Sequence, residues 1–175
     1  MVSIRDLAAV AAVVAIATGL SGCTSFYDAA RNLALQGVAA RLQTLETKTE
    51  DFSGAPQVAT VAARVRAGEL APYLSDTATP LPAVAGGFGY AIYDVTVAHG
   101  TARYDAAAWA TGEGGGGFTG DIVSVYVCVT AVVGKSDLTQ KSFFREVRCR
   151  KDVASLVGKQ QGALHVKLSE VPGYN

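Results

Sequence analysis

An uncharged apolar run near the N-terminus limits how much of this chain is available to fold. Leu7 to Leu20 are Ala, Val, Ile and Leu apart from Thr18 and Gly19, and Arg5 lies just before them. A membrane-spanning helix needs about 20 apolar residues, so this run is short for a permanent span. A short apolar run behind a basic start is typical of a secretory signal peptide. The sequence therefore predicts export from the cytoplasm.

The residues that end this run, Leu20-Ser21-Gly22-Cys23, resemble the lipobox of bacterial lipoproteins. The resemblance covers the first 23 residues. It implies cleavage between Gly22 and Cys23, loss of residues 1–22 as a lipoprotein signal peptide, and a diacylglyceryl group and palmitate-type acyl chains on Cys23. Residues 23–25 would then be a lipidated terminus and spacer. Several acyl chains would hold the protein firmly on the extracytoplasmic face of the cell membrane, or on an outer membrane.

A second processing route remains open in the same segment. Ala15-Ile16-Ala17 is an A-x-A site for ordinary signal peptidase, and Asp6 stands beside Arg5 in the short charged start. Cleavage there would give a secreted protein without lipid.

The charge balance excludes two classes of partner. Lys and Arg number 15 and Asp and Glu number 15, so the formal net charge is zero. The sequence therefore predicts no nucleic-acid surface and no polybasic membrane patch. With 175 residues and a hydrophobic content of 50%, the chain suits one domain with a single core.

Two helices are predicted in the segment 26–70. The first runs from Phe26 to Lys48 and is interrupted by Gly37; its apolar stripe is Leu35, Val38, Leu42 and Leu45. The second begins near Ser53 and Pro56 and ends before Gly68; its apolar face is Val58, Val61, Ala62 and Val65. We interpret both stripes as packing on the domain's own sheet, although a partner helix is an alternative for the first.

Residues 71–87 are rich in Pro and Gly and predict a surface connection to a region of strands over 88–175. The expected breaks are His99-Gly100, the stretch Gly112 to Gly117 and the stretch Gly134 to Lys141. The first turn sets Val97, Val95 and Tyr93 against Ala102, Tyr104 and Ala106. The second brings Val123, Val125 and Val127 to that same side. A closing strand is expected at Leu164, Val166 and Leu168, while 152–162 stays unassigned.

This order of elements predicts an α+β fold in which N-terminal helices pack on a curved antiparallel sheet of four to five strands, arranged as a meander. Residues 26–70 and 88–175 would form one domain. The outline is similar to cystatin-like and NTF2-like domains, but no motif matches, and the cystatin Gln-x-Val-x-Gly loop is absent. The similarity therefore transfers no function.

Cys128 and Cys149 are expected to form a disulfide, because an exported protein is oxidised and Cys23 would carry lipid. Pairing them face to face centres a hairpin between Leu138 and Thr139. That register sets Val127, Val129 and Ala131 against Arg150, Arg148 and Glu146, so either a bulge intervenes or this end of the sheet is exposed. A redox role is disfavoured because there is no C-x-x-C motif.

Asp94 and Asp105 should lie opposite each other on the polar side of the first hairpin, near Arg103. Opposed carboxylates can share a proton or bind a cation. The favoured interpretation is a solvated face that Arg103 neutralises, so we assign no catalytic residue and no metal. His99 and His165 lie outside any metal-ligand spacing and are expected at the surface.

Tyr90 and Trp109 should be cross-strand neighbours on the outer face, where they are candidate binding residues. The run Gly112 to Gly117 lacks the Lys-Ser/Thr ending of a phosphate loop and is expected to be a flexible hairpin tip.

Two functions remain open. The first is a membrane-anchored binding or structural module with an unidentified protein or small-molecule partner and no cofactor, which uses the outer sheet face or the glycine loop. The second is a hydrolase that uses Asp94 and Asp105 in a sheet cavity.

Overall fold

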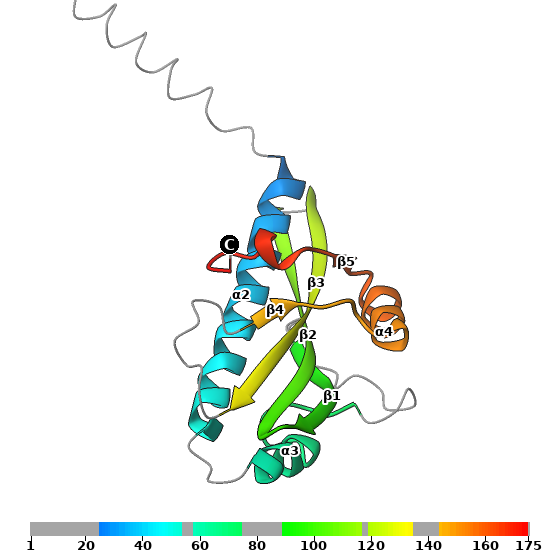
Figure 1. Cartoon of the computed structure of the whole chain (residues 1–175). Helices are drawn as coiled ribbons and strands as arrows, with labels where there is room; N and C mark the ends of the chain where they lie inside the picture. Colours follow the sequence, from blue (N-terminus) through cyan, green and yellow to red (C-terminus); the bar gives the residue numbers. More distant parts are fainter. Residues whose placement is uncertain (1–24, 54–57, 75–88, 117–118, 135–143, 175) are drawn as a thin grey trace, which may run out of the picture.

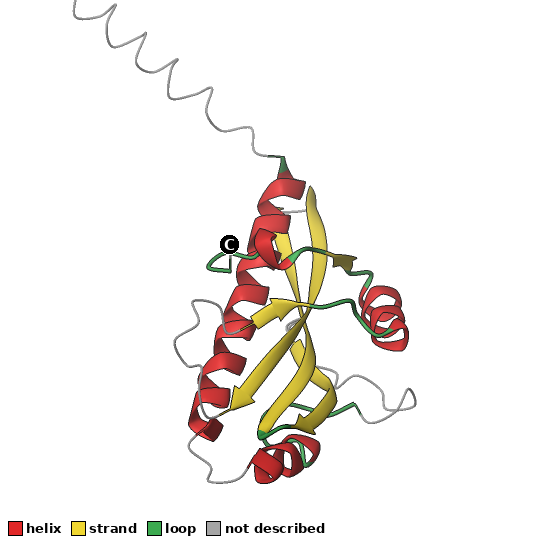
Figure 2. Ribbon diagram, in the orientation of Figure 1, coloured by secondary structure: helices red, strands yellow, loops and turns green. Residues whose placement is uncertain are grey.

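The computed structural model describes residues 25–53, 58–74, 89–116, 119–134 and 144–174 (Figure 1). The helices are α2 (Phe26–Ser53), α3 (Val58–Arg66), α4 (Lys151–Gln161) and the short 3-10 helix η1 (Leu168–Glu170). The strands are β1 (Gly89–Ala98), β2 (Thr101–Gly116), β3 (Thr119–Gly134), β4 (Phe144–Glu146) and β5 (Leu164–His165). Strands β1 to β4 form an antiparallel meander, and β5 runs parallel to β3 (Figure 2). The predicted α+β fold is confirmed.

Helix α2 packs lengthwise on the two long strands β2 and β3. The predicted stripe is fully or almost fully buried: Leu35, Val38, Leu42 and Leu45. Ser25 caps the helix, because its hydroxyl oxygen accepts a hydrogen bond from the Asp28 N–H at 3.1 Å. Helix α3 adds Val61, Ala62 and Val65 to the same core. The side chain of Val58 lies outside the described residues.

The glycine run was wrongly expected to be a flexible tip, because residues 112–116 belong to strand β2. A Cβ on Gly112 would lie 2.0 Å from the Ala30 carbonyl oxygen, and one on Gly114 would lie 2.0 Å from that of Phe26. The backbone of α2 therefore touches the backbone of β2 here. Strand glycines often mark such an approach, which no residue with a Cβ permits.

A β-bulge changes the first hairpin from the predicted register. The turn lies at His99-Gly100 as expected and pairs Val95 with Tyr104, but the register shifts between Ile92 and Asp94. Tyr93 is the extra residue, so Ile92 takes the predicted place opposite Ala106 on the core face. Tyr93 instead points to the other face of the sheet, where it joins a separate buried cluster.

The second hairpin keeps its predicted faces. Strands β2 and β3 pair without interruption from Thr101↔Gly134 to Gly116↔Thr119. This register places Val123, Val125 and Val127 in the same core as Ala102, Tyr104 and Ala106. The pairing thus continues through most of the predicted break, up to Gly116.

The outer face of the sheet is also packed, which the sequence analysis did not anticipate. The unassigned segment forms α4, and this helix covers the face opposite α2. The cluster beneath α4 contains Leu74, Ala91, Tyr93, Ala107, Trp109, Tyr126, Cys128, Val153, Val157 and Ala163. The sheet is thus sandwiched between α2 on one face and α4 on the other.

Two predicted connections differ from the structure. Residues 71–74 are not a surface connection, because Ala71 and Leu74 are buried and the Leu74 N–H donates to the Ile92 carbonyl oxygen at 2.8 Å. The rest of the predicted connection, 75–87, lies outside the described residues. The closing strand is only Leu164–His165, after which Val166 and Leu168 still turn into the core.

Candidate functional site

The described part of the chain begins two residues after the candidate lipidation site. Cys23 and the neighbouring cleavage residue Gly22 lie outside the described residues. Among the described helices, none is both long and apolar enough to cross a bilayer.

A disulfide joins Cys128 to Cys149, with Cα atoms 5.3 Å apart. Cys128 is fully buried in β3, on the face that α4 covers. Cys149 follows the short strand β4, so the bond ties the chain that enters α4 to the centre of the sheet. The two cysteines are separated by 21 positions in the sequence.

The expected register around this bond was wrong. Strand β4 pairs Val129 with Glu146 and Ala131 with Phe144, two residues away from the predicted alignment. Phe144 therefore faces the core, and the strand ends at Glu146, before Arg148 and Arg150. The Val147 N–H donates to the Cys128 carbonyl oxygen at 3.1 Å, and Arg148 is exposed.

Arg150 makes a second link between this segment and the sheet. Its Nη1 donates to the Tyr93 carbonyl oxygen at 2.7 Å, and its guanidinium carbon lies 5.4 Å from the centre of the Tyr93 ring. Its Nε donates to both carboxylate oxygens of Asp152, at 2.8 and 3.0 Å. This bond lowers the pKa of Asp152. Arg150 thus connects the start of α4 to the bulge in β1.

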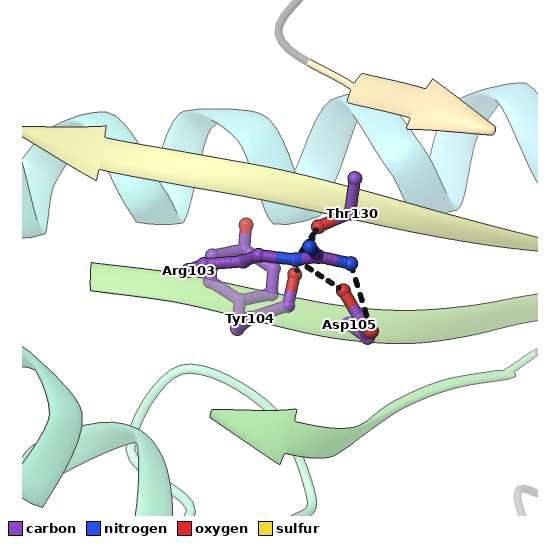
Figure 3. Close-up of polar contacts among 4 residues, drawn as sticks. All are labelled: Arg103, Tyr104, Asp105 and Thr130. Carbon is purple, nitrogen blue, oxygen red and sulfur yellow. Dashed lines mark hydrogen bonds and ion pairs between the residues drawn. The ribbon is translucent and has the colours of Figure 1, made fainter. Parts of the chain in front are cut away.

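Asp94 and Asp105 are cross-strand partners, as predicted. Arg103 donates from Nε to Asp105 Oδ1 at 3.2 Å and to Thr130 Oγ1 at 2.9 Å (Figure 3). The pair therefore has the neutralised arrangement that the sequence analysis favoured, although Arg103 contacts Asp105 rather than the diagonal Asp94. Within the described residues, no group of three or more His, Cys, Asp or Glu side chains is arranged to hold a metal ion.

Tyr93 lies near the charged side chains of Asp94, Asp105 and Arg103. The sequence analysis did not predict its buried position on this face of the sheet. Its hydroxyl is buried and has no hydrogen-bond partner among the described residues. Burial raises the pKa of Tyr93, and the nearby carboxylate of Asp105 raises it further. The hydroxyl therefore stays protonated at neutral pH.

Tyr90 and Trp109 are not the neighbours that the sequence analysis expected. The bulge pairs Gly89 with Trp109 and Tyr90 with Ala108, which turns the two rings to opposite faces. Trp109 is 3% exposed and covers Gly89, where a Cβ would lie 2.3 Å from the indole ring. Tyr90 packs on the α2 side, and its hydroxyl accepts a hydrogen bond from Lys48 Nζ at 3.0 Å. The two rings do not form a joint binding surface.

The two histidines lie far apart. His99 occupies the first hairpin turn with a φ of 50°, and His165 in β5 packs edge-on against Tyr126 at 5.2 Å between ring centres. Both are exposed, as expected.

Comparisons with protein-family models, with curated proteins and with solved structures each found no match to this chain. The described contacts on the outer face stabilise the fold: they connect β1, β3 and α4 by a disulfide, an arginine and a buried aromatic cluster.

Proposed function

We propose that this protein is an exported lipoprotein, in which lipid on Cys23 anchors an extracytoplasmic binding or structural module. The observation that carries the proposal is the sequence Leu20-Ser21-Gly22-Cys23 at the end of an uncharged apolar run. Lipid on Cys23 would attach the chain to a membrane without a spanning helix in the folded domain.

Two features of the described residues support an exported, tethered domain. The disulfide Cys128–Cys149 suits an oxidising compartment, since cytosolic thiols are kept reduced. Ser25 caps α2 only two residues after Cys23, so the folded domain would begin directly at the anchor.

A binding or structural role is supported by how the polar residues are used. Arg103 donates hydrogen bonds to Asp105 and to Thr130, and Arg150 donates to Asp152, so these charged side chains are engaged within the fold. Asp94 and Asp105 also lie on the face opposite α2, so they do not face the interior between helix and sheet that an NTF2-like cavity would occupy.

Metabolic labelling with fatty acid and detergent-phase partition would test the anchor in a bacterial host. The natural chain should take up label and enter the detergent phase, whereas Cys23→Ala should do neither. Cys149→Ala is the matched control, because it removes a cysteine but keeps the lipobox. A natural chain that stays unlabelled in the aqueous phase, cut after Ala17, would contradict the proposal.

A further inference from the structure

Exposed apolar side chains gather at the end of the molecule where α2 begins. Phe26 is 53% exposed, Tyr27 43% and Leu33 48%, and all three belong to the first turns of α2. Ile122 in β3 is 70% exposed, the highest value among the large hydrophobic residues of the described chain. We call these four residues the tip surface.

Backbone contacts hold the two parts of the tip surface together. Ile122 pairs with Glu113, which is next to Gly114, and Gly114 lies against the backbone of Phe26. Figure 1 shows the first turn of α2 beside the far end of the β2–β3 hairpin. The four residues therefore lie at one end of the molecule, although Ile122 points away from the helix.

We propose that the tip surface rests on the lipid bilayer that anchors Cys23, with its apolar side chains at the boundary between headgroups and acyl chains. This inference rests on the proposed function and adds an orientation to it. In this orientation the lipid surface contacts the four apolar side chains, which do not pack in the core of the domain.

The length of the tether carries the argument. Phe26 follows Cys23 by three residues, so even a fully extended chain separates them by roughly 10 Å. The headgroup region on each side of a bilayer is roughly 5 to 8 Å thick. A lipidated Cys23 would therefore hold Phe26 and Tyr27 at the membrane surface, where the amphipathic ring of tyrosine is favoured.

The charges around the tip surface indicate shallow contact with neutral lipid. Asp28, Glu113 and Asp121 are all exposed at this end. Arg31, the nearest cation in α2, forms an ion pair with Glu170. Carboxylates at the bilayer surface are repelled by anionic headgroups, so the surface suits a zwitterionic bilayer that the apolar residues enter only to headgroup depth.

The far end of β3 offers a matched control. Val132 is 56% exposed and lies ten residues after Ile122, on the same face of the same strand. At the rise of a β-strand, the two positions are roughly 33 Å apart. A probe at Val132 should therefore stay in water when a probe at Ile122 reaches lipid.

The experiment uses the mature lipidated protein in phosphatidylcholine vesicles with brominated acyl chains, which quench tryptophan only at close range. Ile122→Trp and Tyr27→Trp are compared with Val132→Trp; each keeps the buried Trp109 as constant background. All three substitutions are at exposed positions, so the fold should tolerate them. We expect loss of the added emission at positions 122 and 27, with the emission at 132 unchanged.

The possible failures are distinguishable. If the intact mass shows lipid on Cys23 but neither tip probe is quenched, the docking inference is overturned and the lipoprotein proposal stands. Equal quenching of all three probes would overturn the orientation, because the domain would lie along the bilayer. Absence of lipid on Cys23 would overturn the proposed function and, with it, the tether argument.

Discussion

At the scale of single residues, two buried tyrosines use their hydroxyls in opposite ways. The Tyr104 hydroxyl lies 2.6 Å from the hydroxyl of Thr49, which is fully buried and itself donates to the Leu45 carbonyl oxygen at 2.6 Å. The Tyr93 hydroxyl is buried without a described partner. A buried polar group without a hydrogen bond costs free energy, whereas a satisfied one stabilises the fold modestly.

Replacing each tyrosine with phenylalanine should therefore affect the free energy of unfolding differently. Tyr104→Phe removes the hydrogen bond between the Tyr104 and Thr49 hydroxyls, leaves Thr49 only its bond to Leu45, and should lower the free energy of unfolding by about 1 kcal/mol. Tyr93→Phe removes an unsatisfied group and should leave the free energy of unfolding unchanged or raise it. Urea unfolding of the two variants measures the difference, and an equal loss in both would show that Tyr93 is hydrogen-bonded in solution.

At the scale of elements, the contact between α2 and β2 depends on glycines at two strand positions. A Cβ at Gly112 would also lie 2.6 Å from the Ala34 nitrogen, so the helix has to move before an alanine fits. Overpacking of this kind costs about 1 to 3 kcal/mol. Gly158 in α4 is different, because its added Cβ would meet only the Ala163 carbonyl oxygen at an ordinary 3.7 Å.

We expect Gly112→Ala to destabilise the domain by about 1 to 3 kcal/mol because it separates α2 from β2. Gly158→Ala should be neutral or should stabilise the domain by up to about 1 kcal/mol, because alanine favours a helix over glycine. Thermal or urea unfolding tests the pair. If Gly112→Ala is as stable as the natural chain, the close helix–strand approach is not present in solution.

The disulfide belongs to the same scale, since it joins β3 to the segment that leads into α4. Closing a loop with a sequence separation of 21 is worth about 3 kcal/mol in the chain-entropy account. Cys149→Ala should lower the free energy of unfolding by about 3 kcal/mol. It should also speed amide hydrogen exchange more in α4 than in β2. Uniformly faster exchange across the molecule would show that α4 is not a separate cooperative unit.

The sequence predicted these elements well where side-chain periodicity carries information, and poorly where it does not. The stripe of α2 and the turn at His99-Gly100 follow from spacing and turn chemistry. The bulge does not, because Ala91, Ile92 and Tyr93 are all apolar and no alternation marks the extra residue. That one residue moved Tyr90 and Trp109 to opposite faces and removed the predicted aromatic pair.

The prediction of a flexible tip at Gly112 to Gly117 was wrong for a related reason. A strand of glycines has no side-chain pattern, so Gly112 to Gly116 resemble a loop until the helix that needs them is placed. Helix α4 did carry a signal, with Val153 and Val157 one turn apart and Gly162 in the left-handed conformation at its end. The sequence analysis nevertheless left 152–162 unassigned.

At the scale of the whole molecule, the domain has a long helix on one face of a sheet, a short helix on the other, and exposed apolar residues at the end where α2 begins. The buried cluster beneath α2 and the buried cluster beneath α4 cover both faces of the sheet near its centre. A partner would therefore meet edges, ends or loops rather than a broad sheet face, and the end with Phe26 and Ile122 is the one we assign to lipid.

The most direct test of the central claim is the intact mass of the mature protein, purified from membranes and measured with and without reductant. Our account predicts a chain that begins at Cys23, carries the mass of a diacylglyceryl group and gains a pair of hydrogen atoms on reduction of Cys128–Cys149. A chain that begins after Ala17 with no added mass, or one that keeps residues 1–22, would contradict it.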